Sequence, residues 1–323
     1  MKIVNFGSLN LDHVYRVKHF VRPGETLTAE SLQRFHGGKG ANQSVALARA
    51  GVKNLCHAGC IGKDGVQLKE KLEKEGVDCR FLFVSEQIPT GHAVIQVTDS
   101  GENNIILFGG ANRAITVDMV DQVMDFLEEG DYLVLQNEIN LMDRIMMLAH
   151  RKGARIFLNP APMNGDILSC PLELADTFIV NQTEACGLVG ENTNTPGDSP
   201  PPEYLLEKIR NQFPSVSVLL TLGEAGALYS GGGRFSTASS GEILRIRAVK
   251  TRAVDTTAAG DTFTGYFIAG LFQGMPLRDS LSRAARASAA AVSRKGAQSS
   301  IPRLAELKEA DTTSFSPENT HHA

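Results

Sequence analysis

The feature that most constrains this chain is a repeated alternation of apolar strand and amphipathic helix after residue 116. Neighbouring parallel strands need a long crossover, usually a helix, so the alternation predicts a mainly parallel, doubly wound sheet with helices on both faces. Polar residues or glycine follow each strand, and they would meet at the carboxyl edge, where open α/β sheets bind ligands. The predicted strands comprise residues 3–6, 55–61, 132–136, 155–158, 177–180 and 216–220.

Two segments in the first third of the chain break this rhythm. Short alternating pieces between residues 14 and 35, such as residues 26–32, predict antiparallel strands. Residues 89–97 and 104–108 predict a hairpin. We expect these strands to form a small sheet that projects from the main one, which would be suited to closing over a small ligand.

The length of 323 residues allows one large α/β domain or two smaller ones. We interpret residues 1–308 as a single domain, with lid segments at about residues 13–36 and 89–110 inserted in it. Residues 191–202, rich in Pro, Asn and Thr, predict a mobile surface loop. Residues 309–323 are expected to form a disordered tail.

Composition limits the partners and the compartment. A net charge of −4 gives no argument for binding nucleic acid or a membrane surface. No apolar run approaches the roughly 20 residues that span a bilayer, and the N-terminal residues lack the layout of a signal peptide. The five cysteines are scattered and complete no metal site, which is typical of reduced thiols. We therefore expect a cytoplasmic protein with small-molecule ligands.

The strongest candidate site lies at residues 255–263. Three small residues, 258–260, precede Asp261, and an apolar helical pattern follows from Phe263. The first N–H groups of a helix lack internal partners and carry the positive end of the dipole, so they bind anions, commonly phosphate. An acidic residue beside phosphate would repel its ligand unless it takes a proton from an attacking hydroxyl. The alternative is that Asp261 is only a helix N-cap.

A second glycine-rich segment spans residues 36–43 and precedes an amphipathic helix. Its glycines permit a ligand to approach the backbone closely. The segment matches neither the P-loop nor the dinucleotide-binding pattern, so taken alone it could equally be a flexible turn. Asp12 follows the first predicted strand and could hold sugar hydroxyls or be an ordinary loop carboxylate.

With these pieces in place, the chain resembles the ribokinase (PfkB) family of carbohydrate kinases over about residues 2–308. Two signatures carry the resemblance: Gly-Gly-Lys-Gly-Ala-Asn at residues 37–42 and Asp-Thr-Thr-Ala-Ala-Gly-Asp at residues 255–261. Their order and separation are highly specific. The resemblance implies a three-layer fold with a small β-sheet lid, and ATP-dependent phosphorylation of the 5-hydroxyl of D-ribose with Asp261 as the base. Supporting segments are residues 7–12, 159–162, 181–184 and 294–298.

The resemblance also implies roles for individual residues. The N–H groups of Ala258, Ala259 and Gly260 would form an anion hole for the transferred phosphoryl group. The sugar contacts would be Asn10, Leu11, Asp12, Gly38, Lys39, Gly40, Ala41, Asn42, Glu138 and Asp261. The nucleotide contacts would be Asn181, Glu184, Thr221, Leu222, Gly223, Glu224, Ala225, Gly226, Gly260 and Asp261, with Asn181 and Glu184 tied to magnesium and phosphate.

The resemblance further implies a monovalent cation, usually K⁺, beside the anion hole, and a homodimer formed through the lid. Such a cation would fix the loop that aims the amides without touching substrate. Its site would involve Asp255, Thr257, Ala291, Arg294, Gly296 and Ser300. One departure from the family is Ala285, where ribokinases often carry a His near the adenine.

Two alternative functions stay open. The first is another kinase of the same family, acting on deoxyribose, a ketohexose or a nucleoside. The second is a non-catalytic sugar or nucleotide sensor on the same scaffold. Asp12 and Asn42 favour a sugar with a cis-diol over a deoxy sugar, and the intact Asp261 counts against a sensor.

Overall fold

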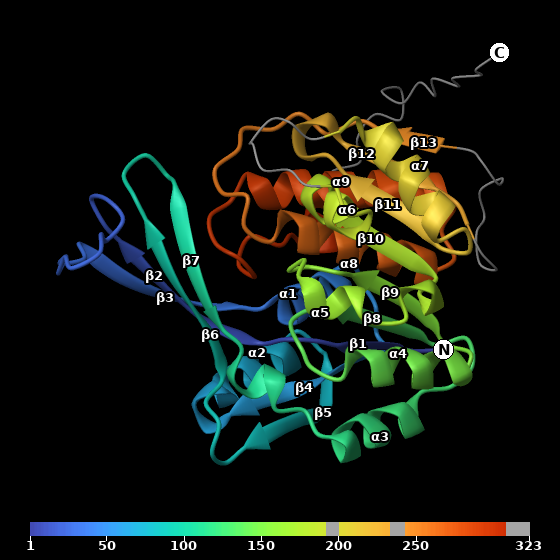
Figure 1. The fold of residues 1–323 in the computed structure, drawn as a ribbon, viewed down its shortest axis with the longest axis horizontal. Helices are drawn as coiled ribbons and strands as arrows, with labels where there is room; N and C mark the ends of the chain where they lie inside the picture. The colour runs from blue at the N-terminus through green and yellow to red at the C-terminus, as the bar shows by residue number, and fades with distance from the viewer. Residues whose placement is uncertain (192–199, 233–242, 308–323) are drawn as a thin grey trace.

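A computed structural model describes residues 1–191, 200–232 and 243–307 of the chain. The predicted tail at residues 309–323 lies outside these residues, as does most of the predicted surface loop at residues 191–202. Figure 1 shows a large body of sheet and helices, from which a smaller sheet projects on one side. The architecture is therefore the predicted one: a mixed α/β fold with a separate small sheet.

The main sheet has nine strands within the described residues, in the order β13-β12-β11-β10-β9-β8-β1-β4-β5. Neighbours from β5 to β11 are parallel, and β12 and β13 add antiparallel strands at one edge. From β1 the chain goes to β4 and β5 on one side and to β8–β11 on the other, so the sheet is doubly wound about β1. The strands are β1 (Ile3–Phe6), β4 (Leu55–Gly62), β5 (Asp78–Ser85), β8 (Tyr132–Gln136), β9 (Arg155–Asn159), β10 (Thr177–Asn181), β11 (Ser217–Thr221), β12 (Ala227–Ser230) and β13 (Ile243–Ile246).

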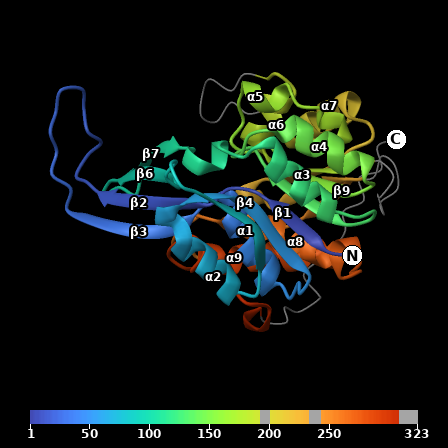
Figure 2. The same cartoon turned by 90° about the horizontal axis from the view of Figure 1, so that it is seen from below.

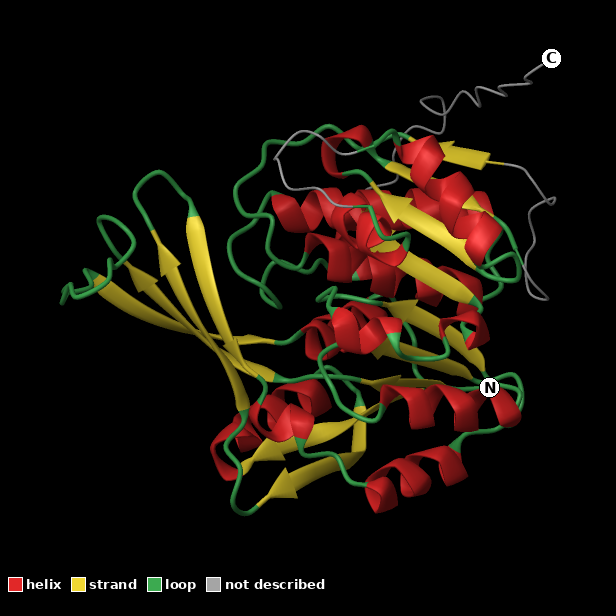
Figure 3. Cartoon of the chain, viewed as in Figure 1, coloured by secondary structure: helices red, strands yellow, loops and turns green. Residues whose placement is uncertain are grey.

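Helices cover both faces of this sheet, as Figures 2 and 3 show. Strand side chains alternate between two cores: Leu133 and Leu135 of β8 face one, and Tyr132 and Val134 face the other. Strands buried on both faces explain why the sequence shows continuous apolar runs at these positions. The first core is covered by α3 (Val117–Phe126), α4 (Met142–Arg151), α5 (Gly165–Leu168), α6 (Gln182–Leu188) and α7 (Pro202–Gln212). The second is covered by α1 (Lys39–Arg49), α2 (Val66–Lys74), α8 (Ala259–Phe272) and α9 (Leu277–Val292).

The small sheet has the strand order β3-β2-β6-β7. It combines an antiparallel β2–β3 pair with the β6–β7 hairpin, joined by parallel pairing of β2 with β6. The predicted strand at residues 26–32 begins only at Ser31, because β2 ends at Arg16, which pairs with Ser31. The strands are β2 (Asn10–Arg16), β3 (Ser31–Gly37), β6 (Gly91–Val97) and β7 (Asn103–Phe108).

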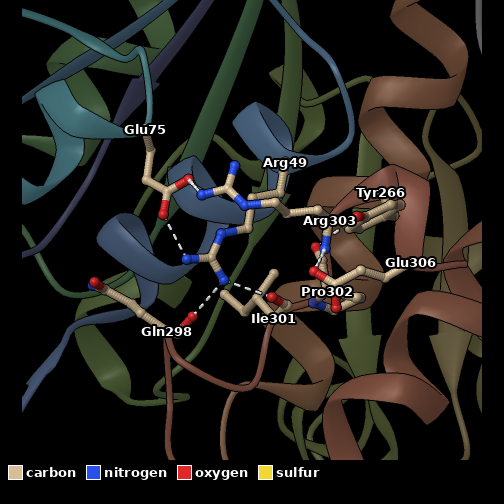
Figure 4. Close-up of polar contacts among 8 residues, drawn as sticks. All are labelled: Arg49, Glu75, Tyr266, Gln298, Ile301, Pro302, Arg303 and Glu306. Carbon is tan, nitrogen blue, oxygen red and sulfur yellow. Dashed lines mark hydrogen bonds and ion pairs between the residues drawn. The ribbon is translucent and has the colours of Figure 1, made fainter.

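A partly buried ion cluster attaches the C-terminal segment, residues 294–306, to the helices (Figure 4). Arg49, the last residue of α1, donates from Nη1 to the carbonyls of Gln298 at 2.9 Å and Ile301 at 2.5 Å. Its Nη2 pairs with Glu75 Oε1 at 2.5 Å. These bonds use both terminal nitrogens of a guanidinium that is mostly withdrawn from water, and they hold the segment against α1. Its buried Nε has no partner in the described residues. The other residues drawn are Tyr266, Pro302, Arg303 and Glu306.

In the part of the chain that the structure describes, the helices are too short or too polar for any of them to span a bilayer. All five cysteines lie within the described residues and are free. Cys56, Cys60, Cys79 and Cys186 are buried, and Cys170 is partly buried.

Candidate active site

Asp261 is the third residue of α8 and is buried, with 9% of its surface exposed. Its Oδ2 accepts a hydrogen bond from Asn42 Nδ2 at 2.9 Å, and its Oδ1 accepts one from Gln43 Nε2 at 3.0 Å. The N-cap of α8 is Ala258, in the left-handed conformation with φ 60°. The alternative reading of Asp261 as an N-cap is therefore wrong. Its carboxylate binds side chains of α1 and not the amides of its own helix.

The start of α8 is open to solvent. Gly260 is exposed, and a Cβ added there would meet no atom within 4 Å. No residue in the described ranges accepts a hydrogen bond from the amides of Ala258 or Gly260. The amide of Ala259, one of the three predicted anion-hole donors, donates to the Thr256 carbonyl at 3.2 Å and is occupied in this structure. Unpaired amides at a helix start, next to a buried carboxylate, can receive a phosphoryl group.

The glycine-rich segment brings the start of α1 against the end of β1. Gly38 has φ 90°, and a Cβ on Gly40 would lie 2.4 Å from the Ser8 amide nitrogen. Only glycine tolerates both conditions, so this segment is a loop of defined geometry and not a flexible turn. Glu138, after β8, accepts from the Lys39 amide at 3.1 Å and from the Ser8 hydroxyl. Two predicted sugar contacts, Lys39 and Glu138, thus come together with Ser8.

Asp12 in β2 closes the sugar side of this group. Burial and, as a smaller cause, the nearby negative charge of Glu138 together raise the pKa of Asp12 to about 7. Gly37 makes the room, since a Cβ there would lie 1.9 Å from Asp12 Oδ2. The neighbouring Asn10 is buried, and its Oδ1 accepts from Asn112 Nδ2 at 2.8 Å. Asp12 is therefore a carboxyl that can change charge near neutral pH.

Lys39 connects the two sides of the site electrostatically. Burial alone would lower the pKa of Lys39, but the negative charges of Asp261, Glu138 and Glu184 outweigh burial and raise it. Its ammonium therefore stays charged between the sugar-side carboxylates and Glu184, which lies on the nucleotide side.

The predicted nucleotide residues lie at the carboxyl ends of β10 and β11, where Asn181 and Thr221 are paired in register. Asn181 caps α6, and a capping box joins its side chain and amide to Glu184. After β11, the 3₁₀ turn η4 (Gly223–Ala225) is solvent-exposed and ends at Gly226. The predicted residues Leu222, Glu224 and Ala225 belong to this turn and its flank. The two strand ends form one continuous polar edge.

The predicted cation residues divide into two groups. Asp255 accepts from the Thr257 amide through Oδ1 and from the Gly296 amide through Oδ2, both at 2.9 Å. Burial would raise the pKa of Asp255, but these hydrogen bonds and the charge of Lys295 hold it below its usual value. The other three contribute no side-chain contact to this loop: Ala291 is a buried helix residue, Arg294 pairs with Glu306 at 2.6 Å, and the Ser300 hydroxyl donates to the Ala297 carbonyl at 2.7 Å. Any contribution of these three residues to a cation site could come only from their backbone carbonyls.

Several polar residues that contact the site were missed by the sequence analysis. They act between segments far apart in the chain, and no spacing pattern reveals such contacts. Gln43 had one local signal, because it directly follows Asn42 in the glycine-rich signature. The missed residues are Ser8, Gln43, Asn112, Gln136 and Asn159.

Comparison with known proteins agrees with this geometry. Residues 1–304 match the sequence profile of the family described as pfkB family carbohydrate kinase. The chain is 37% identical over 311 residues to a ribokinase from Haemophilus influenzae, covering 94% of this chain and 96% of that protein.

Solved structures give the same result. A ribokinase from Cryptococcus neoformans var. grubii in complex with ADP superposes with a TM-score of 0.79 at 33% identity, covering 95% of this chain and 99% of that one. An Arabidopsis thaliana ribokinase complexed with ribose and ATP superposes with a TM-score of 0.78 at 27% identity, covering 95% and 97%.

The raised pKa of Asp12 gives a direct test of the sugar-side electrostatics. We expect the Asp12 carboxyl to titrate near pH 7 in the ligand-free protein, as followed by carbon-13 NMR, with Asp12→Asn identifying the signal. Replacing Glu138 by Gln should lower the pKa of Asp12, because it removes a neighbouring negative charge. Titration of Asp12 below pH 5 in the unsubstituted protein would contradict this account of burial and charge.

Proposed function

The chain belongs to the pfkB family of carbohydrate kinases, and we propose that it transfers the γ-phosphoryl group of ATP to the 5-hydroxyl of D-ribose. The product is D-ribose 5-phosphate. The observation that carries the proposal is the buried carboxylate of Asp261 beside the open first turn of α8. This arrangement offers a proton acceptor and anion-binding amides at one place, which is what phosphoryl transfer to an alcohol requires.

In this mechanism the protein mainly positions the reactants and stabilises charge. Asp261 takes the proton from the attacking hydroxyl as the oxygen approaches the γ-phosphorus. Asn42 and Asp12 orient the sugar, and the Asn42 Oδ1, buried without a partner in the described residues, is free to accept from a sugar hydroxyl. The amides of Ala258 and Gly260 receive negative charge that develops on the transferred group.

The nucleotide lies along the edge formed by Asn181 and the turn after β11 in this proposal. No group of three or more His, Cys, Asp or Glu in the described residues could hold a metal ion by itself. This suits Mg²⁺ that is held largely by substrate phosphates with one carboxylate, for which Glu184 is the candidate. Bound Mg²⁺ supplies positive charge that offsets the charge of the phosphates.

A monovalent cation, K⁺, is proposed for the loop around Asp255. The residues there fit such an ion: a single ionised carboxylate joins two loops whose backbone carbonyls are oxygen donors. The ion would fix the geometry of residues 255–258, which lead directly into α8. Its effect would be preorganisation of the amides at the helix start.

Two other functions are possible on the same scaffold. Another kinase of the same family, acting on deoxyribose, a ketohexose or a nucleoside, would use the same base and anion hole. Asp12 and Asn42 favour a sugar with two neighbouring hydroxyls over a deoxy sugar. A non-catalytic sensor would have no need to keep Asp261 buried and doubly hydrogen-bonded opposite open amides.

We also propose a homodimer that forms through the small sheet. All six residues of β7 are exposed, including Ile105, Ile106, Leu107 and Phe108. A run of four exposed apolar residues on an edge strand is unfavourable in water and is usually covered by a partner. A second copy of this sheet would bury it and would close over the sugar at the same time.

The proposed reaction is tested by measuring ADP release over a panel of pentoses, hexoses and nucleosides. We expect D-ribose to give the highest kcat/KM. In Asp261→Asn, kcat should fall by about 10²–10⁴-fold because the proton acceptor is lost. The exposed Asp279→Asn in α9 is a matched control that should leave kcat unchanged. Near-normal turnover in a folded Asp261→Asn variant would remove the base assignment, and no turnover with any panel member would favour the sensor.

The cation proposal predicts a higher rate in K⁺ than in Na⁺ at fixed ionic strength. In Asp255→Asn the preference for K⁺ should disappear, because the ionised ligand is gone while the shape of the side chain is kept. Initial rates across a series of chloride salts provide the measurement. Equal rates of the unsubstituted enzyme in both salts would argue against an occupied cation loop.

The dimer proposal predicts a two-subunit mass in sedimentation equilibrium. The substitution Ile106→Asp should shift the protein to monomers, because a charge would be buried at the interface. Val117→Asp, an exposed apolar position at the start of α3, is the matched control and should stay dimeric. Dissociation in both variants, or in neither, would speak against the small sheet as the interface.

A further inference from the structure

A chain of buried polar side chains extends from Asp261 into the interior of the protein. Gln43 Nε2 donates to Asp261 Oδ1 at 3.0 Å, and Gln136 Nε2 donates to Gln43 Oε1 at 2.7 Å. The same Gln136 nitrogen donates to Asn5 Oδ1 at 3.0 Å. Asn5 Nδ2 then donates to Ser44 Oγ at 2.8 Å, and Ser44 Oγ lies 2.8 Å from His57 Nδ1. Apart from Asp261, every member has no exposed surface: Asn5, Gln43, Ser44, His57 and Gln136.

The chemistry of these groups gives the chain one direction. An ionised carboxylate can only accept, so the amino group of Gln43 must face Asp261 and its oxygen must face Gln136. Gln136 donates to that oxygen and also to Asn5, which leaves Asn5 to donate onward to Ser44. Ser44 accepts from Asn5, so its own hydrogen is available for His57.

His57 ends the chain, and its Nδ1 can accept the hydrogen of Ser44. Burial lowers the pKa of His57 to about 4, so the imidazole is neutral at physiological pH. A neutral ring can accept at Nδ1 and carry its hydrogen at Nε2. A protonated ring would instead donate at Nδ1 and would oppose the Ser44 hydrogen. The orientation of Asn5 is fixed independently, because its Nδ2 also donates to the Gly40 carbonyl at 2.7 Å, and a carbonyl can only accept. The neutral histidine is compatible with this orientation, which presents a donor to Asp261.

We propose that Gln43 is a positioning residue that holds the catalytic carboxylate in one orientation, and that Gln136, Asn5, Ser44 and His57 fix the amide of Gln43. Asn42 binds the other oxygen of Asp261, but its side chain also faces the sugar in the proposed mechanism. If the sugar takes over the side chain of Asn42, Gln43 remains as the residue that holds the carboxylate of Asp261. The inference rests on the proposed role of Asp261 as the base.

The positioning matters because a general base must meet the attacking hydroxyl in a narrow range of geometry. Misplacement of a reacting group by about 1 Å can cost roughly 100-fold in rate. The charged groups that face Asp261 are Lys39 and Glu184, which act on it electrostatically. Neither is hydrogen-bonded to it in this structure, so they cannot set its orientation as the two amides do.

The first test compares Gln43→Met with the unsubstituted enzyme. Methionine keeps the length of the side chain and removes the donor, so kcat should fall by about 10- to 100-fold. KM for ribose and for ATP should change by less than about threefold, because Gln43 has no exposed surface for a substrate to contact. Gln136→Met leaves Gln43 in place but frees its amide, and should give a smaller fall in kcat. Gln273→Met, which removes a hydrogen-bonded glutamine at the far end of α8, is the control and should leave kcat unchanged.

The second test separates positioning from simple packing. Gln43→Glu keeps the shape and restores a donor only when the new carboxyl is protonated. Its kcat, relative to that of Gln43→Met at the same pH, should therefore rise as pH falls from 8 to about 5. A purely structural role predicts a ratio that does not change with pH. This comparison tests the positioning role of Gln43 even if Gln136→Met does not fold.

These experiments distinguish failure of the positioning role of Gln43 from failure of the proposed kinase function. If Asp261→Asn keeps turnover, the base assignment fails, whatever Gln43 does. If Asp261→Asn is inactive while folded Gln43→Met keeps the full kcat, or if the ratio of the two Gln43 variants is flat with pH, the positioning role is overturned and the kinase function stands.

Discussion

The structure depends on one buried contact, in which α1 and α8 meet around the carboxylate of Asp261. The two hydrogen bonds join residues 219 and 218 positions apart, and without them a buried charge would be left unsatisfied at several kcal/mol. The helices must approach closely for these side chains to reach. Gly265 makes that possible, because a Cβ there would lie 2.4 Å from the Cβ of Ala46. The close packing of α1 against α8 and the hydrogen bonding of the Asp261 carboxylate therefore depend on each other.

The loop before α8 is restrained from a second direction. The amides of Val254 and Asp255 donate to the Val292 carbonyl, and Asp255 binds the Gly296 amide. The segment that begins at Arg294 is in turn fixed to α1 by Arg49. Helix α1 therefore supports the first turn of α8 twice, directly through Asp261 and indirectly through the C-terminal segment. In the proposed function its amino end faces the sugar, so one helix would carry both substrate contacts and the supports of the helix that bears the proposed base.

The sequence predicted those features that depend on local pattern. Strand–helix alternation gave the parallel sheet, and the small residues before Asp261 marked the start of α8 correctly. Spacing alone could not decide whether Asp261 caps that helix, because the answer depends on Asn42 and Gln43, which lie in another segment. The same limit explains why Ser8 and Asn112 were missed, and why the occupied amide of Ala259 was not foreseen. Their partners are set by packing between elements, which no periodicity encodes.

The charges around Lys39 bear on how the two substrates would act on each other. Its ammonium interacts with Asp261 and Glu138, which the proposed function places by the sugar, and with Glu184, which it places by the nucleotide. A phosphate that draws this ammonium toward the nucleotide side would weaken its hold on the sugar-side carboxylates. Asp12, with its pKa near 7, would then be more strongly affected by Glu138. Because interactions of this kind are reciprocal, binding of sugar must alter the affinity for nucleotide by the same factor. In the proposed function, a cation shared by the two half-sites would thus couple them without any movement of the small sheet.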